Sequence, residues 1–540
     1  MVCRDVKMGA TWEALAAKKR QGLLNSIPKE WRIPDHLLPP VSQNDVTGFP
    51  ESSGWFTPAE LDITNSSALE LLPRLASGSL KSETVTRAFC KRAAAAHQLV
   101  NCLSETCFDR AIETARALDE QLARGLGPVG PFHGLPISLK DNFNLRGLDS
   151  TVGFTSLVGD PAQDDAELAS LLLRAGAIVY VKTNVPTAMM IAESVNNTFG
   201  RTVNPRNRLL TSGGSSGGES ALIAFKGSPL GVGTDIGGSL RIPAACTGIF
   251  ALRPSFGRFP TLGCRSGLPG QEAVQSVNGP LARSLPDLEY YCKAVVAAEP
   301  WHADPRCLPI PWRQAALPAK LKIAVLWHDG VVLPTPPVTR ALRHTADRLR
   351  AAGHDVLDWP PEDHALGTQL LMRMFVADGG KAVFRELAKT GEPLRPEMAD
   401  YGQARELGGF EYWQLHLERT AFQKRYLDRW KSAGIDAILA PVTPFSSVEN
   451  GKFRHVGYTG VYNVLDYAAM AFPTGIAVDR AVDVLPSDAP RPLSDLDQVV
   501  RSEYNAEVVH GMPINLQLVA QRLEEEKCVE MCKVIVKALD

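Results

Sequence analysis

Two clusters of glycine and serine, at residues 213–218 and 237–239, constrain this chain more than any other feature. They lie within residues 213–243, which read GGSSGGESALIAFKGSPLGVGTDIGGSLRIP. Glycine at this density costs backbone entropy, so it is kept where the backbone turns sharply or approaches another group closely. A flexible linker does not fit, because the apolar run at 221–225 separates the two clusters. Serine hydroxyls beside open backbone N–H groups favour a nucleophile site.

The composition is that of an ordinary globular protein large enough for one or several domains. The chain has 540 residues, of which 45% are hydrophobic and 21% charged. Its formal net charge of −2 gives no electrostatic reason to expect nucleic acid or an anionic membrane as partner. The start, MVCRDVKMGA, lacks the apolar core of a signal peptide, and no window holds eighteen consecutive apolar residues. We therefore expect a cytoplasmic protein.

The ten cysteines are scattered and give no sign of a metal site. No C-x-x-C pair occurs, and no cysteine has a histidine at zinc-finger spacing. Cys528 and Cys532 are one helical turn apart, but burial in a helix core is the commoner reason for such a pair. The sequence predicts free thiols and no structural metal.

Hydrophobic periodicity predicts helices and strands that alternate along most of the chain. The expected helices span residues 10–24, 67–75, 82–96, 107–123, 164–175, 338–352, 411–433 and 523–539. The expected strands span residues 133–140, 177–182, 321–327, 355–359, 435–439 and 513–519, and a helix and a strand are expected between 219 and 232. This pattern predicts the α/β class, with a single large domain whose twisted mixed β-sheet core is covered by helices. The proline-rich segment before residue 58 is expected to be an extended arm.

Three generic motifs come close to the glycine–serine stretch, and each of them fails. A phosphate-binding P-loop needs a lysine where Glu219 stands, and a dinucleotide fingerprint from Gly231 needs a glycine where Ile236 stands. The nucleophile elbow G-x-S-x-G matches residues 213–217, but it must follow a strand directly, and the preceding NPRNRLLTS is polar. The downstream histidines that could complete a triad, which we interpret as structural, are His364, His455 and His510.

A serine nucleophile without histidine can use a neutral lysine as its base. Free lysine titrates near pKa 10.4, so a lysine base must be desolvated or lie beside other polarising groups. Lys140 ends the apolar run HGLPISLK at 133–140 and is suitably placed. The alternative is a surface lysine that caps a strand, since lysine is rarely buried.

Three separated segments resemble the amidase signature family: HGLPISLKD at 133–141, GGSSGGE at 213–219 and GVGTDIGGSLRIPAA at 231–245. Lys140 and Ser215 are 75 residues apart, and Ser215 and Ser239 are 24 apart, as in fatty-acid amide hydrolase and its relatives. Further segments extend the likeness over nearly the whole chain to the fungal acetamidase and general-amidase branch. These segments are TWEALAAKKR, AFCKRAA, VNNTFGRTVNPRN and EYNAEVVHGMPINLQLVAQRL.

The resemblance implies a triad of Ser239, Ser215 and Lys140. Ser239 would be the nucleophile that forms the acyl-enzyme. Ser215 would be the bridging serine, with a cis peptide bond between Gly214 and Ser215. Lys140 would draw the proton from Ser239 through Ser215 and return it to the leaving nitrogen.

The resemblance also implies an oxyanion site and a set of supporting residues. Backbone N–H groups of Ile236, Gly237, Gly238 and Ser239 would receive the negative charge of the carbonyl oxygen, and side chains at 237 and 238 would obstruct it. Ser216 would support the hydrogen-bond network, and Met189 would contact substrate. Asp235 and Arg241 are expected to hold the turn by polar contacts.

The function implied is a cofactor-independent amidohydrolase that converts an amide and water to carboxylate and ammonia through an acyl-serine. Two alternatives stay open: an amidotransferase subunit that supplies ammonia, and an esterase or acyltransferase of specialised metabolism. The expected partner is a small-molecule amide, and a homodimer is a family-based expectation. Residues 1–57 would form an N-terminal helix and arm packed on a catalytic domain at 58–540.

The sequence departs from the family around the presumed pocket. Residues 186–190 read PTAMM, where the fungal acetamidases have PQTLM. Thr187 lacks the long amide side chain of glutamine, so the resemblance does not carry over a strict acetamide preference.

Overall fold

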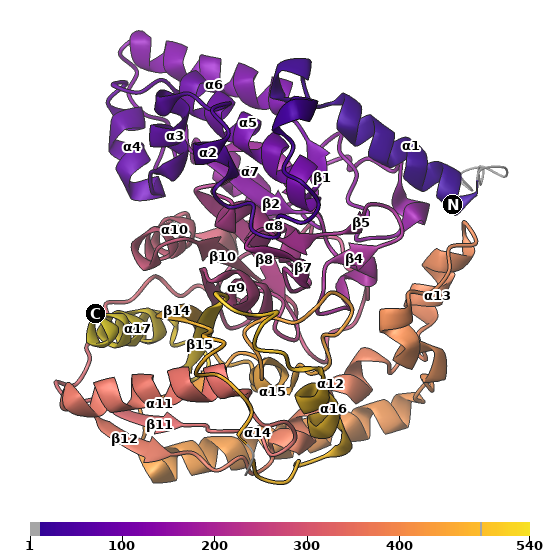
Figure 1. Ribbon diagram of the computed structural model, residues 1–540, viewed down its shortest axis with the longest axis vertical. Coiled ribbons are helices and arrows are strands. Elements are labelled where there is room, and N and C mark those ends of the chain that lie inside the picture. Colours follow the sequence, from indigo (N-terminus) through magenta and orange to yellow (C-terminus); the bar gives the residue numbers. More distant parts are fainter. Residues whose placement is uncertain (1–10, 487–488) are drawn as a thin grey trace.

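A mixed sheet of eleven strands forms the core of the fold (Figure 1). The computed structural model describes residues 11–486 and 489–540. Residues 1–10, which include the first residue of the expected helix 10–24, lie outside the described residues. In spatial order the strands are β1 (Leu103–Thr106), β3 (Ile178–Thr183), β2 (Pro136–Lys140), β8 (Leu230–Asp235), β10 (Val277–Ala282), β9 (Phe250–Arg253), β14 (Ala469–Ala477), β15 (Pro513–Val519), β13 (Ala437–Pro441), β11 (Lys322–Val325) and β12 (Asp355–Asp358). The α/β class and the single large domain with a mixed sheet are confirmed.

Parallel pairing occurs at two places in the sheet, and antiparallel pairing joins them. β2 lies between β3 and β8 and runs parallel to both, while β11 runs parallel to β12 and β13. The strands in the middle, from β8 through β10, β9, β14 and β15 to β13, pair antiparallel. The pairing of β2 with β8 matters for function, because it brings residues near 140 beside residues near 234.

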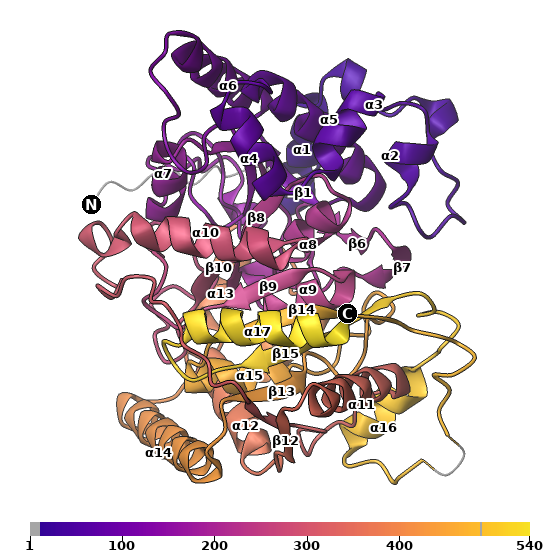
Figure 2. The same cartoon turned by 90° about the vertical axis from the view of Figure 1, so that its left-hand side faces the viewer.

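Helices surround this sheet along its whole length. They are α1 (Trp12–Asn25), α2 (Phe49–Ser52), α3 (Pro58–Asn65), α4 (Ala68–Ala76), α5 (Ser82–Val100), α6 (Phe108–Ala123), α7 (Glu167–Arg174), α8 (Gly217–Ala224), α9 (Arg241–Thr247), α10 (Leu285–Ala297), α11 (Pro336–Ala351), α12 (His364–Phe375), α13 (Lys381–Ala388), α14 (Gly409–Ala433), α15 (Gly457–Leu465), α16 (Asp495–Glu503) and α17 (Glu525–Leu539). Figure 2 shows α17 lying across β14, where Cys528 and Cys532 are buried in the core. Among the described residues, no helix combines the length and the apolar character needed to cross a bilayer.

Most predicted elements exist, with shifted ends. The expected helix 67–75 is α4, and its capping box is formed: Ser67 N–H donates to Glu70 Oε2 at 2.7 Å, and Glu70 N–H donates to Ser67 Oγ at 3.2 Å. The expected helix 82–96 extends to Val100, where Asn101 takes a left-handed conformation with φ of 55° and ends it. The expected strand 133–140 begins only at Pro136, because the residues before it form a turn.

The segment before residue 58 is less extended than predicted. It contains short helical turns at Lys29–Trp31, Asp35–Leu37 and α2. The segment contacts the body: Lys19 Nζ donates to Asp149 Oδ2 at 2.7 Å, and Val46 N–H donates to the carbonyl of Pro205 at 2.9 Å. The division of the chain at residues 57 and 58 stays a prediction.

Candidate active site

Lys140 lies at the carboxyl end of β2 and is completely buried. Its Nζ donates hydrogen bonds to Ser215 Oγ at 2.7 Å and to Thr234 Oγ1 at 2.8 Å. Thr234 belongs to β8, the strand that pairs with β2, so the sheet itself brings lysine and threonine together. The alternative of a surface lysine is excluded.

Ser215 occupies the turn that leads into α8, and its peptide bond with Gly214 is cis, as the resemblance implies. Gly214 is required here by close backbone approach, because a Cβ at this position would meet the backbone nitrogen of Glu193 at 2.6 Å. Ser216 ties this turn to the second cluster, since its N–H donates to the carbonyl of Ser239 at 3.2 Å. The two glycine–serine clusters therefore lie side by side.

Ser239 stands in the turn between β8 and α9 and is the most accessible of the three candidate residues. Its exposed fraction is 9%, against 2% for Ser215 and 0% for Lys140. Within the described residues, Ser239 Oγ makes no hydrogen bond, so its hydroxyl is not committed to a structural contact. It faces a pocket with about 730 Å³ of free space, counted to its open mouth.

The pocket wall is mainly apolar. Met189 lines it, as the resemblance implies, together with Ile236, Ile242, Met372, Phe375 and Val376. Thr187 is not part of the wall: it is completely buried, and its hydroxyl has no partner within the described part of the chain. Met189, two residues further along the same turn, supplies the pocket contact, and the expectation about acetamide preference stays a prediction.

The turn that carries Ser239 is held by a buried ion pair. Arg241 Nε donates to Asp235 Oδ2 at 3.1 Å, and both side chains are completely buried. Arg241 also donates to Asn463 Oδ1 at 2.7 Å and to Gln517 Oε1 at 3.0 Å, which links the turn to α15 and β15. Removing either charge would leave the other buried without its partner, which is strongly destabilising. Asp235 and Arg241 thus hold the turn.

Gly238 differs from its expected role. Its N–H donates to Asp235 Oδ1 at 2.8 Å and is therefore already used. Its φ of +129° and its closeness to Thr459, whose Oγ1 would lie 2.2 Å from an added Cβ, are the reasons for a glycine here. The backbone N–H groups of Ile236, Gly237 and Ser239 make no hydrogen bond to any residue in the described ranges, and all three residues line the pocket.

Burial shifts the titration of two groups at this site. It lowers the pKa of Lys140 to about 7, while the nearby carboxylates of Asp235, Glu219 and Asp141 act in the opposite direction. Burial likewise raises the pKa of Glu219 to about 7, although the hydrogen bonds from Ser138 and Thr183 act to lower it. For Asp235, burial would raise the pKa, but the Arg241 guanidinium outweighs it and holds the pKa well below its usual range. Lys140 can therefore be neutral near neutral pH.

The three histidines considered above bond other groups. His364 bonds Tyr426 OH at 3.1 Å, His455 bonds Asp329 Oδ2 at 2.5 Å, and His510 lies 3.1 Å from the carbonyl of Val478. No hydrogen bond joins any of them to Ser215 or Ser239 within the described residues. The site is built on lysine.

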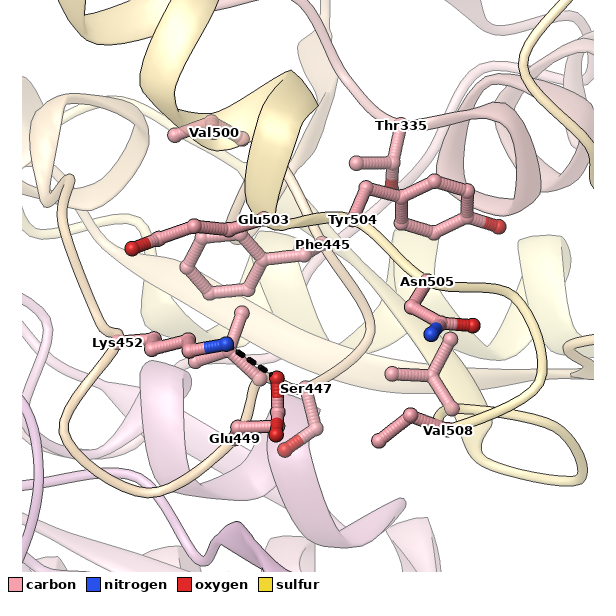
Figure 3. Close-up of a pocket in the computed structure, with 12 residues that line it drawn as sticks. Thr335, Phe445, Ser447, Glu449, Lys452, Val500, Glu503, Tyr504, Asn505 and Val508 are labelled. Carbon is pink, nitrogen blue, oxygen red and sulfur yellow. Dashed lines mark hydrogen bonds and ion pairs between the residues drawn. The ribbon is translucent and has the colours of Figure 1, made fainter.

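A second pocket has no such arrangement (Figure 3). It lies between the loop after β13 and the segment around α16, and its polar groups are already engaged. Lys452 pairs with Glu449, and Ser447 Oγ donates to the carbonyl of Thr211 at 3.0 Å. No serine in this pocket lies within hydrogen-bond reach of a described basic side chain. The pocket that Ser239 lines is therefore the candidate active site.

The comparisons agree with the geometry. The model of the family described as Amidase matches residues 84–529. The chain belongs to the amidase signature family. Within this family it is 41% identical to the acetamidase of Emericella nidulans and 42% identical to that of Aspergillus oryzae, each over 98% of this chain and 99% of the relative.

A solved amidase-family structure shows the same fold. The structure of a fatty acid amide hydrolase superposes with a TM-score of 0.93 at 34% identity, covering 97% of this chain and 94% of the other. The family and its relatives make this chain an amide-hydrolysing enzyme.

Thr234 and Thr459 are the site residues that the sequence interpretation missed. Thr459 Oγ1 donates to the carbonyl of Gly237 at 2.7 Å and so fixes the turn before Ser239. Thr234 could have been found from the sequence, because it stands directly before Asp235 in the motif GVGTDIGGS. Thr459 could not have been found in this way, because it lies 222 residues from Gly237 and outside any of the motifs.

Proposed function

We propose that this enzyme hydrolyses a carboxylic acid amide to carboxylate and ammonia through an acyl-serine formed on Ser239. The observation that carries the proposal is the 2.7 Å hydrogen bond between Lys140 Nζ and Ser215 Oγ, in a completely buried setting beside the accessible Ser239. A base whose pKa is about 7 is suited to take a proton at neutral pH.

In the first half of the reaction, Ser239 Oγ attacks the amide carbon. Its proton passes to Ser215, and the proton of Ser215 passes to Lys140. The N–H groups of Ile236, Gly237 and Ser239 stabilise the negative oxygen, because they are preorganised and have no other partner among the described residues. Lys140 then returns the proton through Ser215 to the leaving nitrogen, and ammonia departs.

In the second half, water attacks the acyl-serine. Lys140 takes the proton of this water through Ser215, and the same N–H groups again stabilise the tetrahedral intermediate. Collapse of the intermediate releases the carboxylate, and Ser239 regains its proton. No cofactor takes part in either half.

The pocket favours an acyl group that is apolar. The pocket that Ser239 lines is walled by the thioether of Met189, the aliphatic side chain of Ile236 and the aromatic ring of Phe375. The relatives named acetamidases indicate that a short acyl chain is accepted in this branch. We propose primary amides with a short to medium apolar acyl group as the substrates. The predicted homodimer stays a prediction.

Amide turnover by the purified chain tests this function. We expect ammonia release from acetamide, hexanamide and benzamide without any partner protein. We expect little from glutamine, because moving its polar groups out of water and against the apolar wall costs free energy. Matched ethyl esters and added hydroxylamine separate hydrolysis from acyl transfer. Ammonia release from glutamine alone would favour the amidotransferase alternative, and turnover of esters alone would favour an esterase.

A further inference from the structure

Glu219 is a completely buried carboxyl in the first turn of α8, four residues after Ser215. Its Oε2 accepts a hydrogen bond from Thr183 Oγ1 at 2.7 Å, and its Oε1 accepts one from Ser138. Ser138 lies on β2 and Thr183 lies on β3. One carboxyl therefore joins the helix that follows the bridging serine to the strand that carries the base and to the strand next to it.

The fold makes room for this carboxyl on a third strand. A Cβ at Gly231 of β8 would lie 1.9 Å from Glu219 Oε1 and 2.7 Å from Ser138 Oγ. No side chain other than hydrogen can stand at residue 231 while Glu219 keeps its place. The carboxyl is enclosed between β2, β3 and β8, which are the strands that position Lys140 and Thr234.

Lys140 shares this environment. It stands two residues after Ser138 on β2, so both side chains point to the same face of the sheet. It is also the register partner of Thr183. Within the described residues, Glu219 makes no ion pair with any lysine, arginine or histidine, so its charge is not neutralised by direct contact.

The other ionisable groups near this pair are few. Asp235 and Asp141 act on Lys140 besides Glu219. Asp235 is neutralised by Arg241, whereas Glu219 and Asp141 make no ion pair within the described residues. Of these two, Glu219 is the one that bonds β2 and β3 through Ser138 and Thr183. Cys102 and Tyr180 are also buried, and the charge of Glu219 contributes to raising the pKa of each.

We propose that Glu219 is a positioning residue for Lys140: it fixes β2 through Ser138 and supplies the negative charge that balances the lysinium when Lys140 takes a proton. This inference rests on the proposed function. Glu219 and Lys140 both titrate near pH 7, so at the pH where Lys140 works the carboxylate is available as its counter-charge.

The test is the pH profile of kcat/KM for the Glu219→Gln variant. Glutamine has the same shape but no charge, so the pKa of Lys140 should fall and the acid limb should move to lower pH by about one unit. The plateau value of kcat should fall about tenfold, because Lys140 becomes a weaker base. The Glu105→Gln variant is the matched control, since Glu105 is a largely buried carboxyl of the same sheet that pairs with Lys19. Its acid limb should stay in place.

A structural role alone would lower activity and thermal stability without moving the acid limb, and that result would overturn the inference. If Glu219→Gln does not fold, Glu219→Asp keeps the charge but shortens the reach to Ser138 and Thr183. This variant should keep the wild-type acid limb and lose about tenfold in kcat, and an unchanged kcat would contradict the positioning role. An absent acid limb in the wild-type enzyme would instead contradict the proposed function itself.

Discussion

Replacing Ser239 with alanine is expected to lower kcat/KM for every amide by about five orders of magnitude or more, because no atom remains to form the acyl bond. The fold should be unaffected: Ser239 Oγ makes no hydrogen bond within the described residues, and the turn is held by Asp235 and Arg241. Ammonia release measures the activity, and thermal unfolding measures the stability.

A second serine of the same stretch provides the control. Ser220 is buried in α8, and its Oγ donates to the carbonyl of Ser212 at 3.1 Å and does not contact Lys140. The Ser220→Ala variant should keep activity within about threefold of wild type and lose about 1 kcal/mol of stability for the missing hydrogen bond. Retained turnover in Ser239→Ala, with an unchanged melting temperature, would show that another residue is the nucleophile.

Replacing Lys140 with methionine is expected to lower kcat by about two to four orders of magnitude, the range of a lost general base. Methionine fits the buried space, and stability at pH 8 should not fall. Burial lowers the folded-state pKa of Lys140 to about 7, whereas the unfolded chain keeps its proton up to the ordinary lysine pKa. The lysine therefore disfavours folding below that ordinary value, and its removal takes this penalty away.

The pH dependence of the wild-type enzyme follows from the same pKa. Lys140 must be neutral to accept a proton, so kcat/KM should rise with pH through about 7 and level off above it. The Lys182→Met variant is the control, because Lys182 is also completely buried but bonds Ser150 Oγ at 2.7 Å, away from the triad. This variant should keep the acid limb. An undiminished rate well below pH 7, or activity in Lys140→Met, would exclude Lys140 as the base.

The three residues of the proposed triad could be selected from the sequence because they lie in short contiguous motifs. What the sequence could not show is how the turn is held, since Arg241 bonds Asn463 and Gln517, which are 222 and 276 residues away. The contact that requires a glycine at residue 238 could not be predicted for the same reason. Its neighbour Thr459 comes from a distant helix, and without that contact the glycine could only be interpreted through the oxyanion.

The sequence predicted the α/β class of the sheet but did not predict all of its strands. β10 reads VNGPLA and β14 reads AMAFPTGIA, and the glycine and proline in each are typical of turns. Both become strands because neighbouring strands pair with them on either side, and tertiary context overrides local propensity. The short helices after residue 28 were missed because each spans a single turn or little more and has no periodicity to detect.

The most direct measurement of the acyl-serine mechanism is the mass of the enzyme during turnover. The enzyme would be quenched in acid while it hydrolyses an amide or the matched ester, and its intact mass and peptides analysed. We expect one added acyl group, located on Ser239, and none in the Ser239→Ala variant. An acyl group on Ser215 or on a cysteine, or turnover without any covalent adduct under conditions where deacylation is slow, would contradict the mechanism.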